Sequence, residues 1–118
     1  MILQQAIMQL SKPGNIKKVG RLVMLSEYGL AIHKGEGQDV MSKKWVISHF
    51  NSGRSVLKYI KERKNVEGYI KRLIDILPSW TFTIEEFDEG LIGWKIDKSR
   101  LKVEIDAIQK EILEGEKA

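Results

Sequence analysis

The sequence predicts an α+β fold, with an antiparallel β-sheet of two hairpins covered on one face by helices and with a C-terminal amphipathic helix. Two pairs of strand-like runs are each joined by a short turn, as in hairpins. Past the second pair, the apolar residues change from an alternating to a helical spacing. With 118 residues the chain has the length of one ordinary domain, so we expect a single domain over residues 1–118.

The N-terminal segment, residues 1–15, contains ILQQAIMQL, which fits either a short helix or an edge strand. The turn-forming residues KPGN end it. The first hairpin is expected over residues 16–34, where a turn at SEYG joins IKKVGRLVML to GLAIHK. The following GEGQD is a loop, too acidic and too poor in glycine to cradle a phosphate.

The second hairpin completes a pair of hairpins over residues 16–60 and joins WVISHF to RSVLKYI. Its turn is Asn51-Ser52-Gly53, where we expect Gly53 in the left-handed conformation that closes a common hairpin loop. Strict alternation puts Trp45, Ile47 and His49 on one face of the first strand. In the second strand the same rule puts Leu57 and Ile60 on opposite faces.

Three helices are expected after the hairpins. The first spans residues 65–77, with Asn65 as its N-cap, an apolar stripe from Val66 to Leu77 and Pro78 to stop it. A short helix is expected over residues 83–89, because Thr83 and Glu86 have capping-box spacing, and LIGWKI after it could form a last strand.

The terminal helix spans residues 99–115 and carries a short apolar stripe. The stripe is expected to pack on the domain's own sheet, and a homodimer through this helix is the alternative. The acidic residues beside the stripe could instead meet a basic protein partner; they are Glu104, Asp106, Glu111, Glu114 and Glu116.

The composition excludes several classes of site. There are no cysteines, which rules out disulfides, thiolate metal ligands and a cysteine nucleophile. No apolar run approaches the roughly 20 residues of a membrane span. The short apolar run at the start has no basic residue before it, unlike a signal peptide. We therefore expect a cytoplasmic protein with no membrane partner.

We also expect no catalytic site, cofactor or metal. Ser55 and Lys58 match S-x-x-K, but on a strand their side chains point to opposite faces. The two histidines, His33 and His49, could bind a metal together with Glu27. The interpretation that we favour has His33 facing water and His49 hydrogen-bonded near the second turn. Trp80, Phe82 and Trp94 are expected to be core residues.

The charge distribution favours a binding function. Residues 1–72 carry 14 Lys and Arg against 5 Asp and Glu, a balance of +9, whereas residues 73–118 have a balance of −5. A basic half indicates an anionic partner, although a solvated surface explains each residue equally well. Phosphate groups and stacked bases could meet these cations beside Tyr59, Trp45 or Phe50. The candidate binding residues are Lys17, Lys18, Arg21, Lys43, Lys44, Arg54, Lys58, Lys61, Arg63, Lys64, Lys71 and Arg72.

The run KWVISHFNSG, residues 44–53, followed by a helix, resembles small proteins encoded by phages and integrative elements. The resemblance covers about residues 44–82 and transfers no functional residue. It implies a mobile-element setting, where small α+β proteins are commonly DNA-binding factors or inhibitors of host defence, and a location in the host cytoplasm if the protein is phage-encoded.

Two functional hypotheses follow. The first is a non-enzymatic binding module of a phage or mobile element whose basic half engages nucleic acid. The second is a protein-binding inhibitor of a host nucleic-acid-handling or defence complex, comparable to an anti-CRISPR factor.

Overall fold

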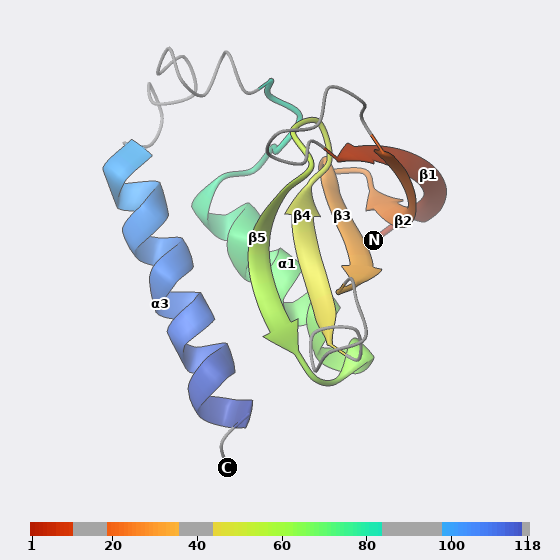
Figure 1. The fold of residues 1–118 in the computed structure, drawn as a ribbon. Helices are drawn as coiled ribbons and strands as arrows, with labels where there is room; N and C mark the ends of the chain where they lie inside the picture. Colours follow the sequence, from red (N-terminus) through yellow and green to blue (C-terminus); the bar gives the residue numbers. More distant parts are fainter. Residues whose placement is uncertain (11–18, 36–43, 84–97, 117–118) are drawn as a thin grey trace.

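The computed structural model describes residues 1–10, 19–35, 44–83 and 98–116. They form a five-stranded antiparallel sheet in the order β1-β2-β3-β4-β5 and two helices, which confirms the predicted α+β fold (Figure 1). The strands are β1 (Leu3–Leu10), β2 (Val19–Ser26), β3 (Leu30–Lys34), β4 (Trp45–His49) and β5 (Arg54–Ile60), and the helices are α1 (Arg63–Ile76) and α3 (Lys98–Glu116). The predicted short helix at 83–89, the predicted strand LIGWKI and Trp94 lie outside the described residues, apart from Thr83.

The N-terminal segment is an edge strand, which settles the alternative that the sequence left open. β1 pairs with β2 in one uninterrupted antiparallel register, from Leu3 opposite Ser26 to Leu10 opposite Val19. β1 and β2 curl strongly beside the flatter β3–β5 part of the sheet (Figure 1). A small apolar cluster forms at the curl, where Met8, Val23 and Ala31 are buried.

The prediction that side chains alternate strictly between the two faces along β5 was wrong. Leu57 and Ile60 are both buried in the main core, although the pattern had put them on opposite faces. The β4–β5 register shifts twice, and Tyr59 has a φ of 65°. A bulge inserts an extra residue and changes which side chains face the core, so Ile60 joins Leu57 on one side.

The predicted start of α1 was also wrong. The helix begins at Arg63, and the N-cap is Glu62, which makes no side-chain capping bond. Asn65 lies inside the first turn, where its backbone N–H donates to the Glu62 carbonyl at 3.1 Å. The C-terminal end is close to the prediction, because Leu77 is the C-cap and Pro78 follows it.

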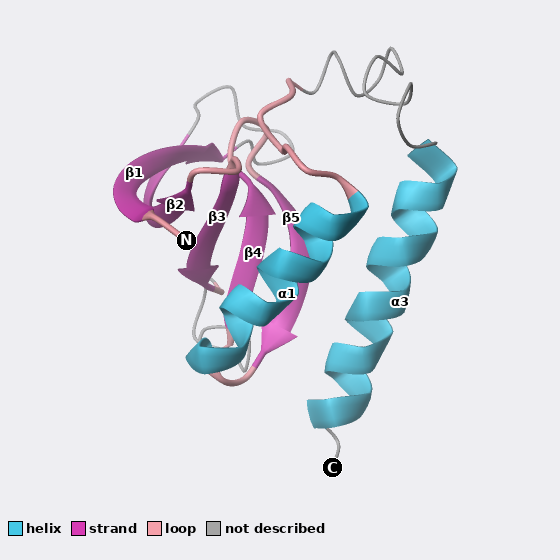
Figure 2. Cartoon of the chain, turned by 180° about the vertical axis from the view of Figure 1, so that it is seen from behind, coloured by secondary structure: helices cyan, strands magenta, loops and turns pink. Residues whose placement is uncertain are grey.

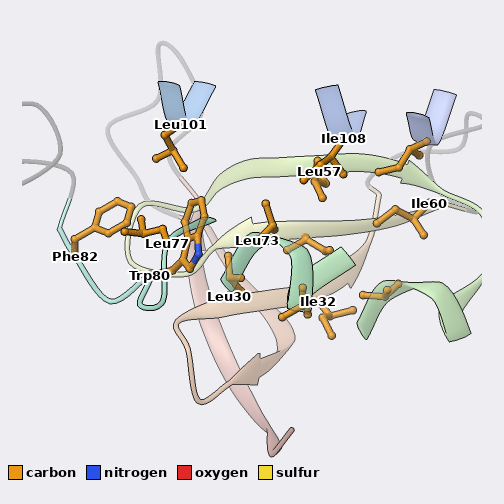
Figure 3. Close-up of a cluster of buried hydrophobic side chains, with 14 residues drawn as sticks. Leu30, Ile32, Leu57, Ile60, Leu73, Leu77, Trp80, Phe82, Leu101 and Ile108 are labelled. Atoms are coloured by element: carbon orange, nitrogen blue, oxygen red, sulfur yellow. The ribbon is translucent and has the colours of Figure 1, made fainter. Parts of the chain in front are cut away.

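The main core lies between the sheet and the two helices. α1 crosses one face of the sheet (Figure 2), and its residues Val66, Ile70 and Leu73 are buried. They belong to the same core as strand residues such as Ile32 and Leu57, which Figure 3 shows with Leu73. Trp80 and Phe82 are buried in the same core, as expected.

α3 lies along β5, at the sheet edge opposite β1 (Figure 1). The apolar stripe of α3 packs into the main core through Leu101, Ile108 and Ile112, so the expected docking on the domain's own sheet is confirmed. The Gln109 side chain bonds both backbone groups of Lys58: its oxygen accepts from the Lys58 N–H at 2.8 Å, and its nitrogen donates to the Lys58 carbonyl at 2.9 Å. α3 thereby covers the β5 edge of the sheet, where a sixth strand could otherwise pair.

The segment after α1 is fixed against the two hairpin turns, and we call this region the turn end of the sheet. The Trp80 N–H donates to the Tyr28 carbonyl at 2.8 Å, and the Asn51 amide donates to the Thr81 carbonyl at 2.7 Å. Both turns contain a left-handed glycine, Gly29 at φ 86° and Gly53 at φ 72°, so the predicted conformation of Gly53 is confirmed. The second connection is one residue longer than predicted, since β4 ends at His49.

Candidate nucleic-acid interface

Cations gather at the end of the sheet opposite the turns. Lys34 pairs with Trp45 across β3 and β4, and Trp45 pairs with Ile60 across β4 and β5. Lys44 and Lys61 adjoin these paired residues, and α1 starts immediately beyond. We call the resulting group the basic end; it consists of Arg21, Lys34, Lys44, Lys61, Arg63 and Lys64.

Backbone and ring contacts hold the basic end in place. The Arg21 guanidinium donates to the Lys34 carbonyl, and the Gly35 N–H donates to the Lys44 carbonyl at 2.9 Å. The Lys34 Nζ lies 5.3 Å from the centre of the Trp45 ring, and the Arg63 Cζ lies 5.6 Å from it. Both distances are within cation–π range. Trp45 therefore brings together charges from β3 and α1 that would otherwise repel.

Of the three aromatic residues proposed for base stacking, Tyr59 is the most accessible. Trp45 is half-buried under its two cations, so a base could stack there only by displacing one of them. Phe50 is half-buried against the Met8 cluster. Tyr59 is exposed at the bulge in β5, close in sequence to Lys61. Tyr59 is thus the aromatic residue best placed to contact a base beside the basic end.

The other predicted binding residues do not join this group. Arg54 begins β5 and lies at the turn end, and Lys58 lies in the middle of β5 beside Gln109. Lys71 is exposed in the middle of α1, while Arg72 forms an ion pair with Glu111 of α3 at 2.6 Å. Lys17, Lys18 and Lys43 lie outside the described residues.

Lys34 is a member that sequence reasoning missed. It is the last residue of β3 and stands alone among uncharged neighbours, so it belongs to no run of basic residues. The signal that could have found it is the link between the two hairpins. An antiparallel β3–β4 pair puts the end of β3 beside the start of β4, which Lys44 immediately precedes.

The two histidines lie on opposite faces of the sheet, and both make hydrogen bonds within the domain. His33 contacts the Lys34 carbonyl and the Ser48 hydroxyl, each at 2.8 Å, so it is hydrogen-bonded and not simply facing water. His49 is buried and stacked on Phe82 with 4.4 Å between ring centres. Within the described residues, no group of three or more His, Cys, Asp or Glu side chains could hold a metal ion.

Both ring nitrogens of His49 are engaged, as expected of a residue that fixes the turn end. Nε2 donates to the Phe82 carbonyl at 2.8 Å, and Nδ1 lies 2.7 Å from the Ser52 hydroxyl. Burial lowers the pKa of His49, and the nearby Arg54 adds to this, while hydrogen bonds to backbone carbonyls oppose it. In the neutral ring Nδ1 therefore accepts a hydrogen bond from the Ser52 hydroxyl, so both ring nitrogens already have partners within the domain.

A cavity of 570 Å³ opens beside His49, between the turn end and the first turns of α3. Its walls are mainly apolar, including Val56, Phe82 and Leu101, and Arg54 and Lys102 also line it. The Trp80 indole N–H is buried with no hydrogen-bond partner among the described residues. The cavity is at the opposite end of β5 from the basic end, so the two are separate features.

The described helices include none that is both long enough and apolar enough to cross a membrane. Comparisons of the chain with protein-family models, with curated proteins and with solved structures find no match.

Proposed function

We propose that the protein is a non-enzymatic binding module that holds nucleic acid at its basic end. The proposal is supported by one observation: six Lys and Arg residues from β2, β3, the residue before β4, the β5–α1 link and α1 converge on one end of the sheet. Guanidinium and ammonium groups so arranged can neutralise successive phosphates. The resemblance to mobile-element proteins supports a setting in a phage or integrative element.

The start of α1 adds to this argument. Its first turn contains no acidic residue, although acids there would favour the helix dipole. Arg63 and Lys64 occupy the first two helical positions, and Lys61 precedes them. Among these residues, Arg63 pairs with Glu67 at 3.7 Å and lies over Trp45, so part of its role is structural. Lys61 and Lys64 are exposed and are the better test of binding; Lys34 is also exposed, but it lies over the Trp45 ring as Arg63 does.

Fluorescence anisotropy with labelled single- and double-stranded oligonucleotides tests the proposal. Affinity should fall steeply as salt rises, because each neutralised phosphate releases bound counterions. The triple variant Lys34→Glu, Lys61→Glu, Lys64→Glu should weaken binding tenfold or more. The matched control is Arg100→Glu, Lys102→Glu, Lys110→Glu on α3, which changes the net charge equally and should retain most of the affinity.

Two results would overturn the proposal. One is the absence of any oligonucleotide binding by the parent protein at low salt. The other is an equal loss of affinity in the two triple variants, which would show that only net charge matters and that the basic end is a solvated surface.

The second candidate function is inhibition of a host nucleic-acid-handling or defence complex through protein contact. The acidic residues of α3 support it, but Glu111 pairs with Arg72, and Glu114 lies 3.9 Å from Lys110. Part of the acidic surface thus already forms ion pairs within the protein. A pull-down from host lysate separates the two functions: one stoichiometric protein partner retained after nuclease treatment supports inhibition, whereas nuclease-sensitive recovery of many proteins supports nucleic-acid binding.

A further inference from the structure

The two edges of the sheet differ in how they are protected. The β5 edge has two register shifts, the charged residue Lys58 and a helix whose Gln109 bonds the Lys58 backbone. These are devices that prevent an edge strand from pairing with another chain. β1 has none of them: it pairs without a bulge, and Ile2 to Leu10 includes no charged residue and no proline. In the described part of the chain, β1 pairs only with β2.

Apolar side chains accompany this open edge. Ile7 of β1 is directly opposite Leu22 of β2, so the two side chains share a face. Ile7 is 54% exposed, Leu22 is 59% exposed, and Ile2, just before the strand, is 70% exposed. Gly20 leaves room for Ile7, since a Cβ at Gly20 would lie 2.8 Å from the Ile7 Cγ2. Among the described residues, the edge therefore offers both backbone groups that no other strand pairs and an apolar strip.

We propose that β1 pairs with β1 of a second copy of this chain, antiparallel about a two-fold axis at Ile7. An axis perpendicular to the sheet keeps like faces together and brings Ile7 opposite the Ile7 of the copy. The exposed side chains then form one strip across four strands, from Leu22 through both Ile7 residues to the second Leu22.

The same register suits the remaining side chains of β1. Gln5 lies opposite Gln9, where the amides can hydrogen-bond, and Ala6 lies opposite Met8. No like charges meet, because β1 has no charged residue. This self-complementarity favours a second copy as the occupant of the edge, since a charged partner strand would find no opposite charge along β1. The apolar stripe of α3 is already buried in its own core, which argues against a dimer through that helix.

Single-cysteine crosslinking tests the register directly, because the natural chain has no cysteine. Opposed residues in antiparallel strands have Cα atoms about 4.5–5.5 Å apart, within the range that a disulfide spans. Copper–phenanthroline oxidation should therefore convert most of an Ile7→Cys variant into a covalent dimer. The control Val103→Cys, on an α3 residue that is 67% exposed, should remain monomeric.

Light scattering after size exclusion provides the second measurement. The parent protein should shift toward twice its 13.6 kDa mass as concentration rises. Ile7→Lys should raise the dimer dissociation constant at least tenfold while Val103→Lys leaves it unchanged. A parent protein that is monomeric at all concentrations, with no more crosslinking at Ile7→Cys than at Val103→Cys, would overturn the proposal. Crosslinking of Val103→Cys without crosslinking of Ile7→Cys would also overturn the proposal, because it would show that the dimer interface lies at α3. If Ile7→Lys does not fold, the crosslinking result decides.

Discussion

The turn end and the basic end of the sheet use their residues for different purposes. At the turn end, backbone groups of the 80–82 segment form hydrogen bonds with Tyr28, His49 and Asn51 and so fix this segment to the two turns. At the basic end, like charges converge and a helix starts without an acid in its first turn. The turn end thus stabilises the domain, whereas the basic end places positive charges at a helix N-terminus, where folding alone would favour acids. The following predictions test this division.

The largest effect is expected at Gly29. A Cβ at this position would lie 2.5 Å from the Trp80 carbonyl oxygen, and the φ of 86° is strained for any other residue. We expect Gly29→Ala to lower the free energy of unfolding by at least about 2 kcal/mol. Chemical denaturation measures this, and oligonucleotide affinity of the folded variant should not change.

Gly68 in α1 provides the matched control for Gly29. No atom lies within 4 Å of a Cβ at Gly68, so Gly68→Ala should stabilise the protein by about 0.5–1 kcal/mol. If the two alanine variants had similar unfolding free energies, the turn end would not have the rigidity that we assign to it.

A smaller loss is expected at Gly53, where φ is 72°. Gly53→Ala should cost about 1 kcal/mol, the penalty for a left-handed backbone with a Cβ. Thermal melting of the variant beside the parent protein measures it. An unchanged midpoint would show that the β4–β5 turn can adopt another conformation.

Charge reversal at the basic end should separate binding from stability. The double variant Lys61→Glu, Lys64→Glu should leave the free energy of unfolding equal or raise it by about 0.3–1 kcal/mol per site, because acidic side chains interact favourably with the dipole at a helix N-terminus. Oligonucleotide binding should fall in the same variant. Arg100→Glu with Lys102→Glu, at the start of α3, makes the same change at another helix N-terminus and should spare binding. A clear loss of stability in the Lys61 and Lys64 variant would contradict the division between the two ends.

The smallest effect at neutral pH is expected from His49. Its pKa in the folded protein is below the usual 6.5, so the unfolded chain takes up a proton first as the pH falls. Stability contributed by the neutral ring is fully present above about pH 6.5 and declines at lower pH. Denaturation at about pH 7 and pH 5 measures this decline. The loss of stability between the two pH values should be smaller in His49→Gln than in the parent protein and unchanged in His33→Gln. The same loss in both variants would show that titratable groups other than His49 cause it.

Hairpins and helices could be predicted because their signals are local. Alternating residues and the turns at Gly29 and Gly53 determine the hairpins, and the spacing from Val66 to Leu77 determines α1. Three features have no such signal. The apolar residues of Leu3–Leu10 fit two periods, and nothing around Tyr59 marks a bulge. The start of α1 depends on how the chain leaves the sheet after Ile60, which overrides the capping preference of Asn65.

The candidate site was predicted only in part, because closeness in sequence differs from closeness in space. Arg54 and Lys61 lie near each other along the chain, but β5 separates them, and a strand of 7 residues spans about 20 Å. Lys34 is more distant in sequence from Lys61, yet the pairing of Lys34 with Trp45 and of Trp45 with Ile60 brings it to the same end of the sheet.

The contact between Gln109 and Lys58 also affects the order in which the molecule opens and closes. The two residues are 51 positions apart, so α3 must close a long loop before it can protect β5. The amide proton of Lys58 is bonded to a side chain of α3 and not to a neighbouring strand. Its hydrogen-exchange rate should therefore report release of α3 alone, separately from the exchange of β3 and β4 amides, which requires the sheet itself to open.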